Sequence, residues 1–193
     1  SILSNDKKIN RNKKKVLIYI SLFRPESKRK IHPNEINLIR VLERYCIKKN
    51  LEFKILCKYH KGTKRGDEEI KFYRKTLDKN FLAIQNSLNR NSYKFLDQSK
   101  IVVSPGSTMG IESLGRKNRT VIINPFPNTH PIKRNFFGYF TKRKNIGFFW
   151  YNGVNEKKIF KLLDNVKNCS NKHWHKIIKK YEYETSIYDP KNA

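Results

Sequence analysis

The chain has 193 residues, of which 12% are aromatic, so it suits one compact domain and does not have the composition of a disordered protein. Lys and Arg number 43 against 16 Asp and Glu, and the resulting net charge of +27 favours anionic partners. Because 31 of these basic residues are Lys and they are spread along the chain, we interpret the charge first as a solvated surface and second as a functional basic face.

The cysteines and the apolar runs indicate where the protein acts. Cys46, Cys57 and Cys169 are odd in number and widely spaced, which predicts neither a disulfide framework nor a zinc site. The apolar run 16–23 is too short for a membrane span and lacks a signal-peptide cleavage site. We therefore expect a cytoplasmic protein, with any membrane contact peripheral, at the inner face and directed to anionic lipid.

Strands and helices are predicted to alternate along a domain that spans residues 16–193, after a basic tail or interdomain linker over 1–15. Apolar and β-branched runs predict strands over 16–23, 51–59, 81–84, 101–103 and 120–123. Helical spacing and capping residues predict helices over 33–50, 67–77, 92–98, 107–116 and after Asn155 and Ser170. This order predicts an α/β fold with an open, doubly wound, Rossmann-like parallel sheet flanked by helices.

Residues 124–153 are predicted to be irregular, and they mix aromatic with basic side chains. Such a segment could stack the bases of a single-stranded nucleic acid. Aromatic residues in a long loop more often pack beneath it, so we favour burial and do not expect a nucleic-acid partner.

The turn that follows the strand over 101–103 carries the main functional signal. A small-residue turn leads into a helix with hydroxyl groups at its mouth, which is the arrangement that holds a phosphate against the helix dipole. Glu112 lies on the same helical face as Thr108, where its carboxylate could accept hydrogen bonds from ribose hydroxyls. The predicted nucleotide-binding residues here are Gly106, Ser107, Thr108, Met109, Gly110 and Glu112.

A second candidate is the basic loop over 60–66, which follows another strand and so lies on the same rim of the sheet. Lys61, Lys64 and Arg65 could clamp a leaving diphosphate, and Ser21 at the end of the first strand could line the same site. A solvated surface loop is the alternative interpretation.

Several motifs are missing from the sequence. It contains no GxGxxG, no Walker loop and no GxSxG, and no Asp-x-Asp pair follows a strand. The acids Asp67, Glu68 and Glu69 are interpreted as a helix N-terminus, so we predict no metal site and no cofactor. No residue is named as the catalytic base.

The segments 91–117, 149–153 and 188–192 resemble bacterial surface-polysaccharide biosynthesis proteins, of the capsule or lipopolysaccharide type. These proteins resemble the donor half of two-domain glycosyltransferases of the GT-B fold. The resemblance implies a C-terminal donor domain that binds a nucleotide-sugar without a metal, with Ser107, Thr108 and Gly110 near the phosphates and Glu112 near the ribose or sugar. It also implies a separate N-terminal acceptor domain and a glycan or glycolipid acceptor.

Two other functions remain open at this point. One is a nucleotide-sugar 2-epimerase or a polyol-phosphate transferase, because these enzymes are similar in fold to the GT-B glycosyltransferases. The other is a basic module that binds single-stranded nucleic acid, for which affinity should fall steeply with salt.

Overall fold

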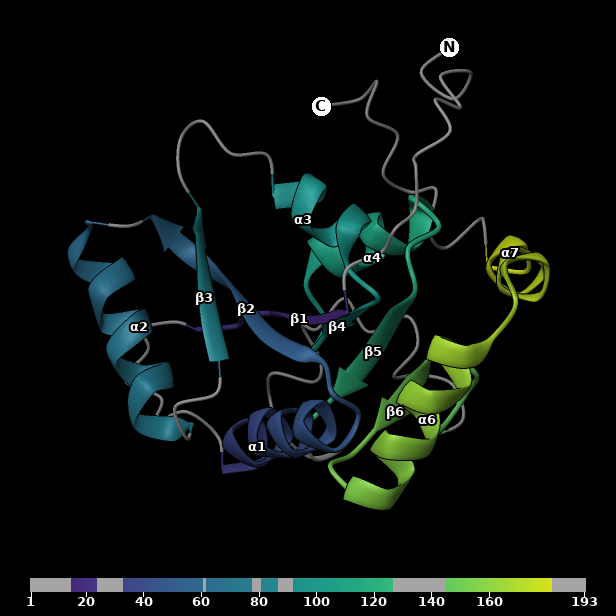
Figure 1. The fold of residues 1–193 in the computed structure, drawn as a ribbon, viewed down its shortest axis with the longest axis horizontal. Helices are drawn as coiled ribbons and strands as arrows, with labels where there is room; N and C mark the ends of the chain where they lie inside the picture. Colours follow the sequence, from purple (N-terminus) through teal and green to yellow (C-terminus); the bar gives the residue numbers. More distant parts are fainter. Residues whose placement is uncertain are drawn as a thin grey trace, which may run out of the picture.

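A computed structural model of the chain describes residues 15–23, 33–60, 62–77, 81–86, 92–126 and 145–181. One six-stranded sheet has the order β3-β2-β1-β4-β5-β6, and its paired strands run parallel (Figure 1). The strands are β1 (Val16–Ile20), β2 (Glu52–His60), β3 (Phe81–Asn86), β4 (Ile101–Ser104), β5 (Thr120–Asn124) and β6 (Trp150–Asn152). The predicted fold class, an open Rossmann-like parallel sheet flanked by helices, is thus confirmed.

Helices cover both faces of this sheet, with α1 and α6 on one side and α3 and α4 on the other (Figure 1). The described helices are α1 (Pro33–Lys48), α2 (Lys64–Thr76), α3 (Ser92–Gln98), α4 (Thr108–Gly115), α6 (Glu156–Asn168) and α7 (Asn171–Lys179). Leu17 and Tyr19 of β1 join the core cluster that contains Leu38 of α1, whereas Ile18 belongs to the cluster that contains Leu96 of α3. Because alternate side chains of β1 face opposite layers, the strand must be apolar throughout, and all five of its residues are buried.

Several strand and helix ends differ from the sequence-based prediction by one to three residues; for example, β1 ends at Ile20 and not at Phe23, and β3 continues to Asn86. Helix α2 begins at Lys64 and not at Asp67, so Lys64, Arg65 and Gly66 belong to its first turn and not to a loop. The strand β6 lies inside the segment 124–153, which was predicted to be irregular. The predicted tail over 1–15 falls almost wholly outside the described residues, as do residues 127–144 and the matching segment 188–192.

The aromatic residues around β6 are part of the core. Phe149 is fully buried. The centroid of its ring lies 6.0 Å from that of Trp174 and 5.2 Å from that of Tyr181. Trp150 and Tyr151 are also buried. For these residues the burial interpretation is confirmed, and their rings are not free to stack on bases.

Polar contacts attach the C-terminal helices to the sheet. Arg119, which directly precedes β5, donates to the carbonyl oxygens of Val166 (2.6 Å) and Lys167 (3.2 Å) in the last turn of α6. The same guanidinium donates to Asn171 Oδ1 at the start of α7 (3.0 Å). The indole Nε1 of Trp174 donates to the carbonyl oxygen of Lys117 (3.0 Å).

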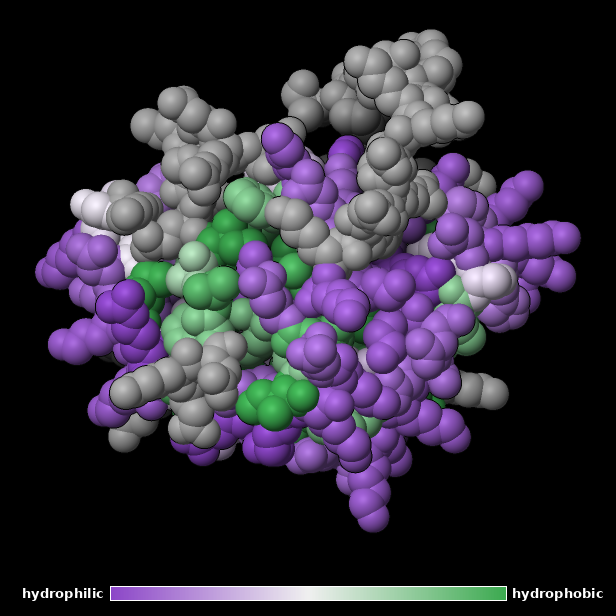
Figure 2. All heavy atoms as spheres, viewed as in Figure 1, coloured by the Kyte–Doolittle hydropathy of each residue, from purple (hydrophilic) through white to green (hydrophobic). Residues whose placement is uncertain are grey.

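The surface differs from one side of the molecule to the other (Figure 2). Hydrophilic side chains dominate over α6 and α7, whereas apolar side chains gather over β2 and β3. Leu82, in the edge strand β3, is 55% exposed.

Candidate functional site

The strand order reverses between β1 and β4. The chain proceeds outward through β2 and β3 on one side of β1, and through β4, β5 and β6 on the other. In open α/β sheets, ligands bind at the carboxyl ends of the strands beside such a reversal. Here those ends are followed by Ser21 on one side and by the turn 105–107 on the other. The structure therefore brings the main predicted motif and Ser21 to neighbouring strand ends.

The turn between β4 and α4 is shaped by Ser104. Its Oγ accepts hydrogen bonds from the N–H groups of Gly106 (3.3 Å) and Ser107 (3.0 Å), so these two donors are already used within the protein. Gly106 has a φ of +111°, a value that favours glycine. A Cβ on Gly110 would lie 2.2 Å from Ser104 Oγ, so this glycine allows α4 to pack closely on β4.

The first turn of α4 has hydrogen-bonding groups without partners among the described residues. Ser107 is the N-cap residue, but its side chain makes no capping hydrogen bond. Among the described residues, the N–H groups of Thr108 and Met109 and the two hydroxyls of Ser107 and Thr108 have no partner. Ser107 and Thr108 are partly exposed, whereas Met109 also packs against the core around Leu96. These donors lie at the positive end of the helix dipole, where an anion is stabilised.

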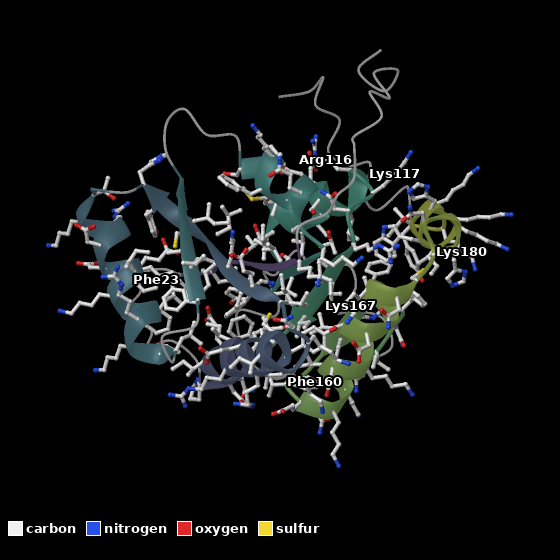
Figure 3. The ribbon with its side chains drawn as sticks, viewed as in Figure 1. Phe23, Arg116, Lys117, Phe160, Lys167 and Lys180 are labelled. Atoms are coloured by element: carbon white, nitrogen blue, oxygen red, sulfur yellow. The ribbon has the colours of Figure 1, made fainter. Side chains whose placement is uncertain are left out.

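Glu112 lies one turn further along α4, half-buried against α3. Its Oε2 accepts a hydrogen bond from the hydroxyl of Tyr93. Asp97 and Arg116 form a two-bonded ion pair between the same helices, and the Arg116 guanidinium lies 5.3 Å from the Tyr93 ring centroid. Figure 3 shows Arg116 at the end of α4, on the side of the molecule away from Phe23. These contacts fix α4 on α3 and hold the Glu112 carboxylate in one orientation.

Ser21 takes part in a buried polar cluster between the end of β1 and helix α2. Its hydroxyl donates to Glu69 Oε1 and lies 2.7 Å from the hydroxyl of Tyr73. Glu69 also accepts from the backbone N–H groups of Lys58 (3.1 Å) and Tyr59 (3.0 Å). Burial raises the pKa of the Glu69 carboxyl, although these hydrogen bonds oppose the rise. The Ser21 side chain thus has internal partners in this structure.

The predicted basic clamp lies at the junction of β2 and α2, which β1 separates from β4. Thr63 caps α2, since its hydroxyl accepts from the Gly66 N–H (3.1 Å) and donates to the His60 carbonyl oxygen (2.8 Å). Lys64 and Arg65 are exposed, and the Arg65 guanidinium lies 5.8 Å from the Tyr59 ring centroid. Lys61 falls outside the described residues.

Two polar residues at this edge of the sheet were missed by the sequence analysis. Glu69 was interpreted as part of an acidic helix start, yet it is fully buried. Its spacing of four residues from Tyr73 and eight from Leu77, both buried, was the available signal. Asn124, which ends β5, is 1% exposed. A polar residue directly after the apolar run 121–123 was the signal there.

Metal-binding and thiol chemistry are not indicated in the described part of the chain. No group of three or more His, Cys, Asp or Glu side chains there could hold a metal ion. Cys46, Cys57 and Cys169 form no disulfide, and burial raises the pKa of the Cys46 thiol to about 12, so that thiol stays protonated. Within the same residues, none of the helices has the length and apolarity needed to cross a membrane.

The parallel sheet, its strand order and the helix mouth beside the reversal define a Rossmann-like α/β protein. The chain belongs to the family described as "putative O-antigen biosynthesis protein", whose model matches residues 1–193. The predicted resemblance to surface-polysaccharide biosynthesis proteins is therefore confirmed at the level of the family, which points to a role in polysaccharide biosynthesis.

Comparisons with individual proteins add little detail. No curated protein matches the chain. The chain is similar to the crystal structure of a "putative UDP-N-acetylglucosamine 2-epimerase from Listeria monocytogenes", with 11% identity and a TM-score of 0.44. The match covers 93% of this chain and 48% of that one, so the chain spans about half the length of that protein.

Proposed function

We propose that this chain is the donor-binding domain of a glycosyltransferase of the GT-B type, which uses a nucleotide-sugar to build O-antigen or a related surface polymer. The family match over residues 1–193 supports the process. The observation that carries the molecular role is the first turn of α4, where two N–H groups and two hydroxyls without partners among the described residues lie beside the reversal of strand order.

In this proposal the diphosphate of the donor binds at the N-terminus of α4. The N–H groups of Thr108 and Met109 and the hydroxyls of Ser107 and Thr108 donate to its oxygens, and no metal is required to offset the charge. The Oε1 atom of Glu112 has no hydrogen-bond partner in the described part of the chain, so it can accept from a ribose or sugar hydroxyl while Tyr93 holds Oε2.

Other parts of the proposed enzyme lie outside these contacts. The acceptor, a glycan or glycolipid, is bound by a separate acceptor domain, and the two domains meet over the carboxyl edge of the sheet. The exposed cations Lys64 and Arg65 add a favourable field for the donor, with Lys61 beside them in the sequence. We place the reaction at the inner face of a membrane, where anionic lipid attracts a chain with a net charge of +27.

A thermal-shift screen against UDP, CDP, GDP, dTDP and CMP tests the donor site. At about 100 times its Kd, a nucleotide should add roughly 2.7 kcal/mol of stability, which corresponds to a shift of about 5 to 11 °C in a chain of this size. Thr108→Val removes one hydroxyl at nearly constant volume and should reduce the shift. Ser170→Ala removes the N-cap hydroxyl of α7 and is the matched control, since it should lower the Tm and leave the nucleotide shift unchanged.

Four results would contradict the proposal in different ways. No shift with any nucleotide, or an equal shift in Thr108→Val and the wild type, would exclude this site. A shift with a single-stranded oligonucleotide alone, lost at high salt, would favour the nucleic-acid function. Epimerised nucleotide-sugar as the only product would assign the same site to a 2-epimerase.

A further inference from the structure

The side-chain amide of Asn124 is buried, and its oxygen has a hydrogen-bond partner whereas its nitrogen has none among the described residues. Its Oδ1 accepts a hydrogen bond from the backbone N–H of Phe126 (3.1 Å), which fixes the orientation of the amide. Its Nδ2 is buried and has no hydrogen-bond partner within the described residues. A buried donor without a partner is costly, and native proteins keep few such groups. The amide nitrogen is therefore a candidate for binding an external acceptor.

The position of Ile122 shows which layer Asn124 faces. A Cβ on Gly110 of α4 would lie 3.5 Å from Ile122 Cδ1, so the Ile122 side chain points toward α4. Side chains alternate along a strand, and Asn124 therefore shares this face with Ile122. Ile122 pairs with Ser104, which places Asn124 two residues beyond that pair, beside the turn 105–107. The buried amide and the mouth of α4 thus lie on one face at the same strand ends.

The two features call for the same kind of ligand. The first turn of α4 offers the N–H groups of Thr108 and Met109, while Ser104 Oγ already binds those of Gly106 and Ser107. Asn124 Nδ2 adds a donor from the neighbouring strand and brings no positive charge. Donors that converge from a helix N-terminus and a strand end suit a group with several acceptor oxygens and a negative charge.

We propose that Asn124 is a further binding residue for the donor, and that its Nδ2 donates a hydrogen bond to a phosphate oxygen of the diphosphate held at the N-terminus of α4. This inference rests on the proposed function, because it takes the diphosphate as the ligand. It adds that β5, and not only the β4–α4 turn, contributes to the phosphate site. It also gives a role to the polar residue that follows the apolar run 121–123 of β5.

Titration calorimetry on the 193-residue chain tests this role, with inorganic pyrophosphate and the nucleoside diphosphates as probes. Asn124→Ala should weaken binding by roughly tenfold to a hundredfold, as expected when a hydrogen bond to a charged group is lost. Asn124→Asp keeps an acceptor for the Phe126 N–H but places a carboxylate beside the phosphates, so it should weaken binding further. Asn118→Ala is the matched control, because Asn118 is also buried but donates to Asp97 Oδ1 at the opposite end of α4.

A purely structural role would give a different result. In that case Asn124→Ala would behave like Asn118→Ala, with a lower Tm and an unchanged Kd, and the inference would be wrong. NMR of the wild-type chain provides a second test, in which the spectrum of Asn124→Asp serves only to assign the side-chain amide signals of Asn124. The side-chain amide signals that are missing in Asn124→Asp should move when the diphosphate is added, and signals that stay fixed at saturation would exclude the contact.

Failure of this inference and failure of the proposed function can be told apart. If the wild type binds a diphosphate and Thr108→Val weakens binding while Asn124→Ala does not, the donor site stands and the role of Asn124 is excluded. If the wild type binds neither pyrophosphate nor any nucleoside diphosphate, both are overturned.

Discussion

The β2–α2 and β4–α4 junctions look alike in sequence but use their polar groups differently. Each has a short turn with glycine and a hydroxyl residue before a helix, and each lies at the carboxyl edge of the sheet. At β2–α2, Thr63 caps the helix and Glu69 binds the N–H groups of Lys58 and Tyr59. At β4–α4, the Ser107 side chain makes no capping hydrogen bond, and the N–H and hydroxyl of Thr108 have no partner in the described part of the chain.

This difference separates two roles for the same kind of motif. Polar groups that already have partners within the protein stabilise the fold, and they leave few donors or acceptors for a ligand. Donors that remain at a helix N-terminus can bind an anion without first breaking a contact. We therefore expect substitutions at the first junction to change stability, and hydroxyl substitutions at the second to change binding.

The largest expected effects come from adding a methyl group at the two helix glycines. In Gly66→Ala the new Cβ would lie 2.1 Å from the carbonyl oxygen of His60, and in Gly110→Ala 2.2 Å from Ser104 Oγ. Each should lower the free energy of unfolding by about 3 kcal/mol, despite the higher helix propensity of Ala. Urea denaturation followed by circular dichroism measures this loss.

A second substitution distinguishes the two clashes. Ser104→Gly removes the side chain that Gly110→Ala meets, so the double variant should be more stable than the sum of the two single losses predicts. The His60 clash involves backbone and has no equivalent rescue. Strictly additive losses at Ser104 and Gly110 would show that α4 does not pack on β4 as described.

The next largest effect is expected at Glu69. Glu69→Gln places an amide N–H against one of the groups that now donate to the carboxylate, and the free energy of unfolding should fall by about 2 kcal/mol. Glu68→Gln, an exposed neighbour on the same helix, is the control and should change stability little.

The difference in stability between the wild type and Glu69→Gln should change with pH in a defined direction. Because burial raises the pKa of this carboxyl in the folded protein, the folded state binds the proton more tightly than the unfolded state. Wild-type stability should therefore fall as the pH rises from the ordinary Glu pKa through the raised one. Glu69→Gln should lack this fall, so the gap between the two proteins narrows with rising pH. A gap that widens over that range would contradict the assignment.

The smallest effects are expected at the two N-cap positions. Thr63→Ala removes a capping hydrogen bond and should cost about 1 kcal/mol. Ser107→Ala removes a hydroxyl that caps nothing, so its cost should be within about 0.5 kcal/mol. Denaturation curves for the two variants, measured side by side, give the comparison. Equal losses would mean that the junctions do not differ in the way described.

Much of the fold could be predicted because its signals are local. The central strands β1, β4 and β5 are buried on both faces, so their apolar runs are continuous and easy to recognise. Asn155 and Ser170 cap α6 and α7 where the sequence predicted. The start of α2 was placed three residues late, because Lys64 and Arg65 are unfavourable at a helix N-terminus and the acids after them are favourable.

The polar contacts of the site could not be predicted in the same way. Ser21 and Glu69 are 48 residues apart, and no local pattern indicates that they meet. The three-residue strand β6 is too short to show alternation, and its aromatic residues also fit a loop. The sequence did identify the hydroxyls of α4, but whether they were free depended on Ser104 and on the absence of a cap, which only the structure describes.

The contacts of Arg119 determine which parts of the protein are expected to unfold together. This side chain occupies carbonyl oxygens at the end of α6 and reaches the start of α7, so it ties both helices to the beginning of β5. The two helices therefore belong to the cooperative unit of the sheet and do not form an independently fraying end. Slow hydrogen exchange should therefore extend across α6 together with β5.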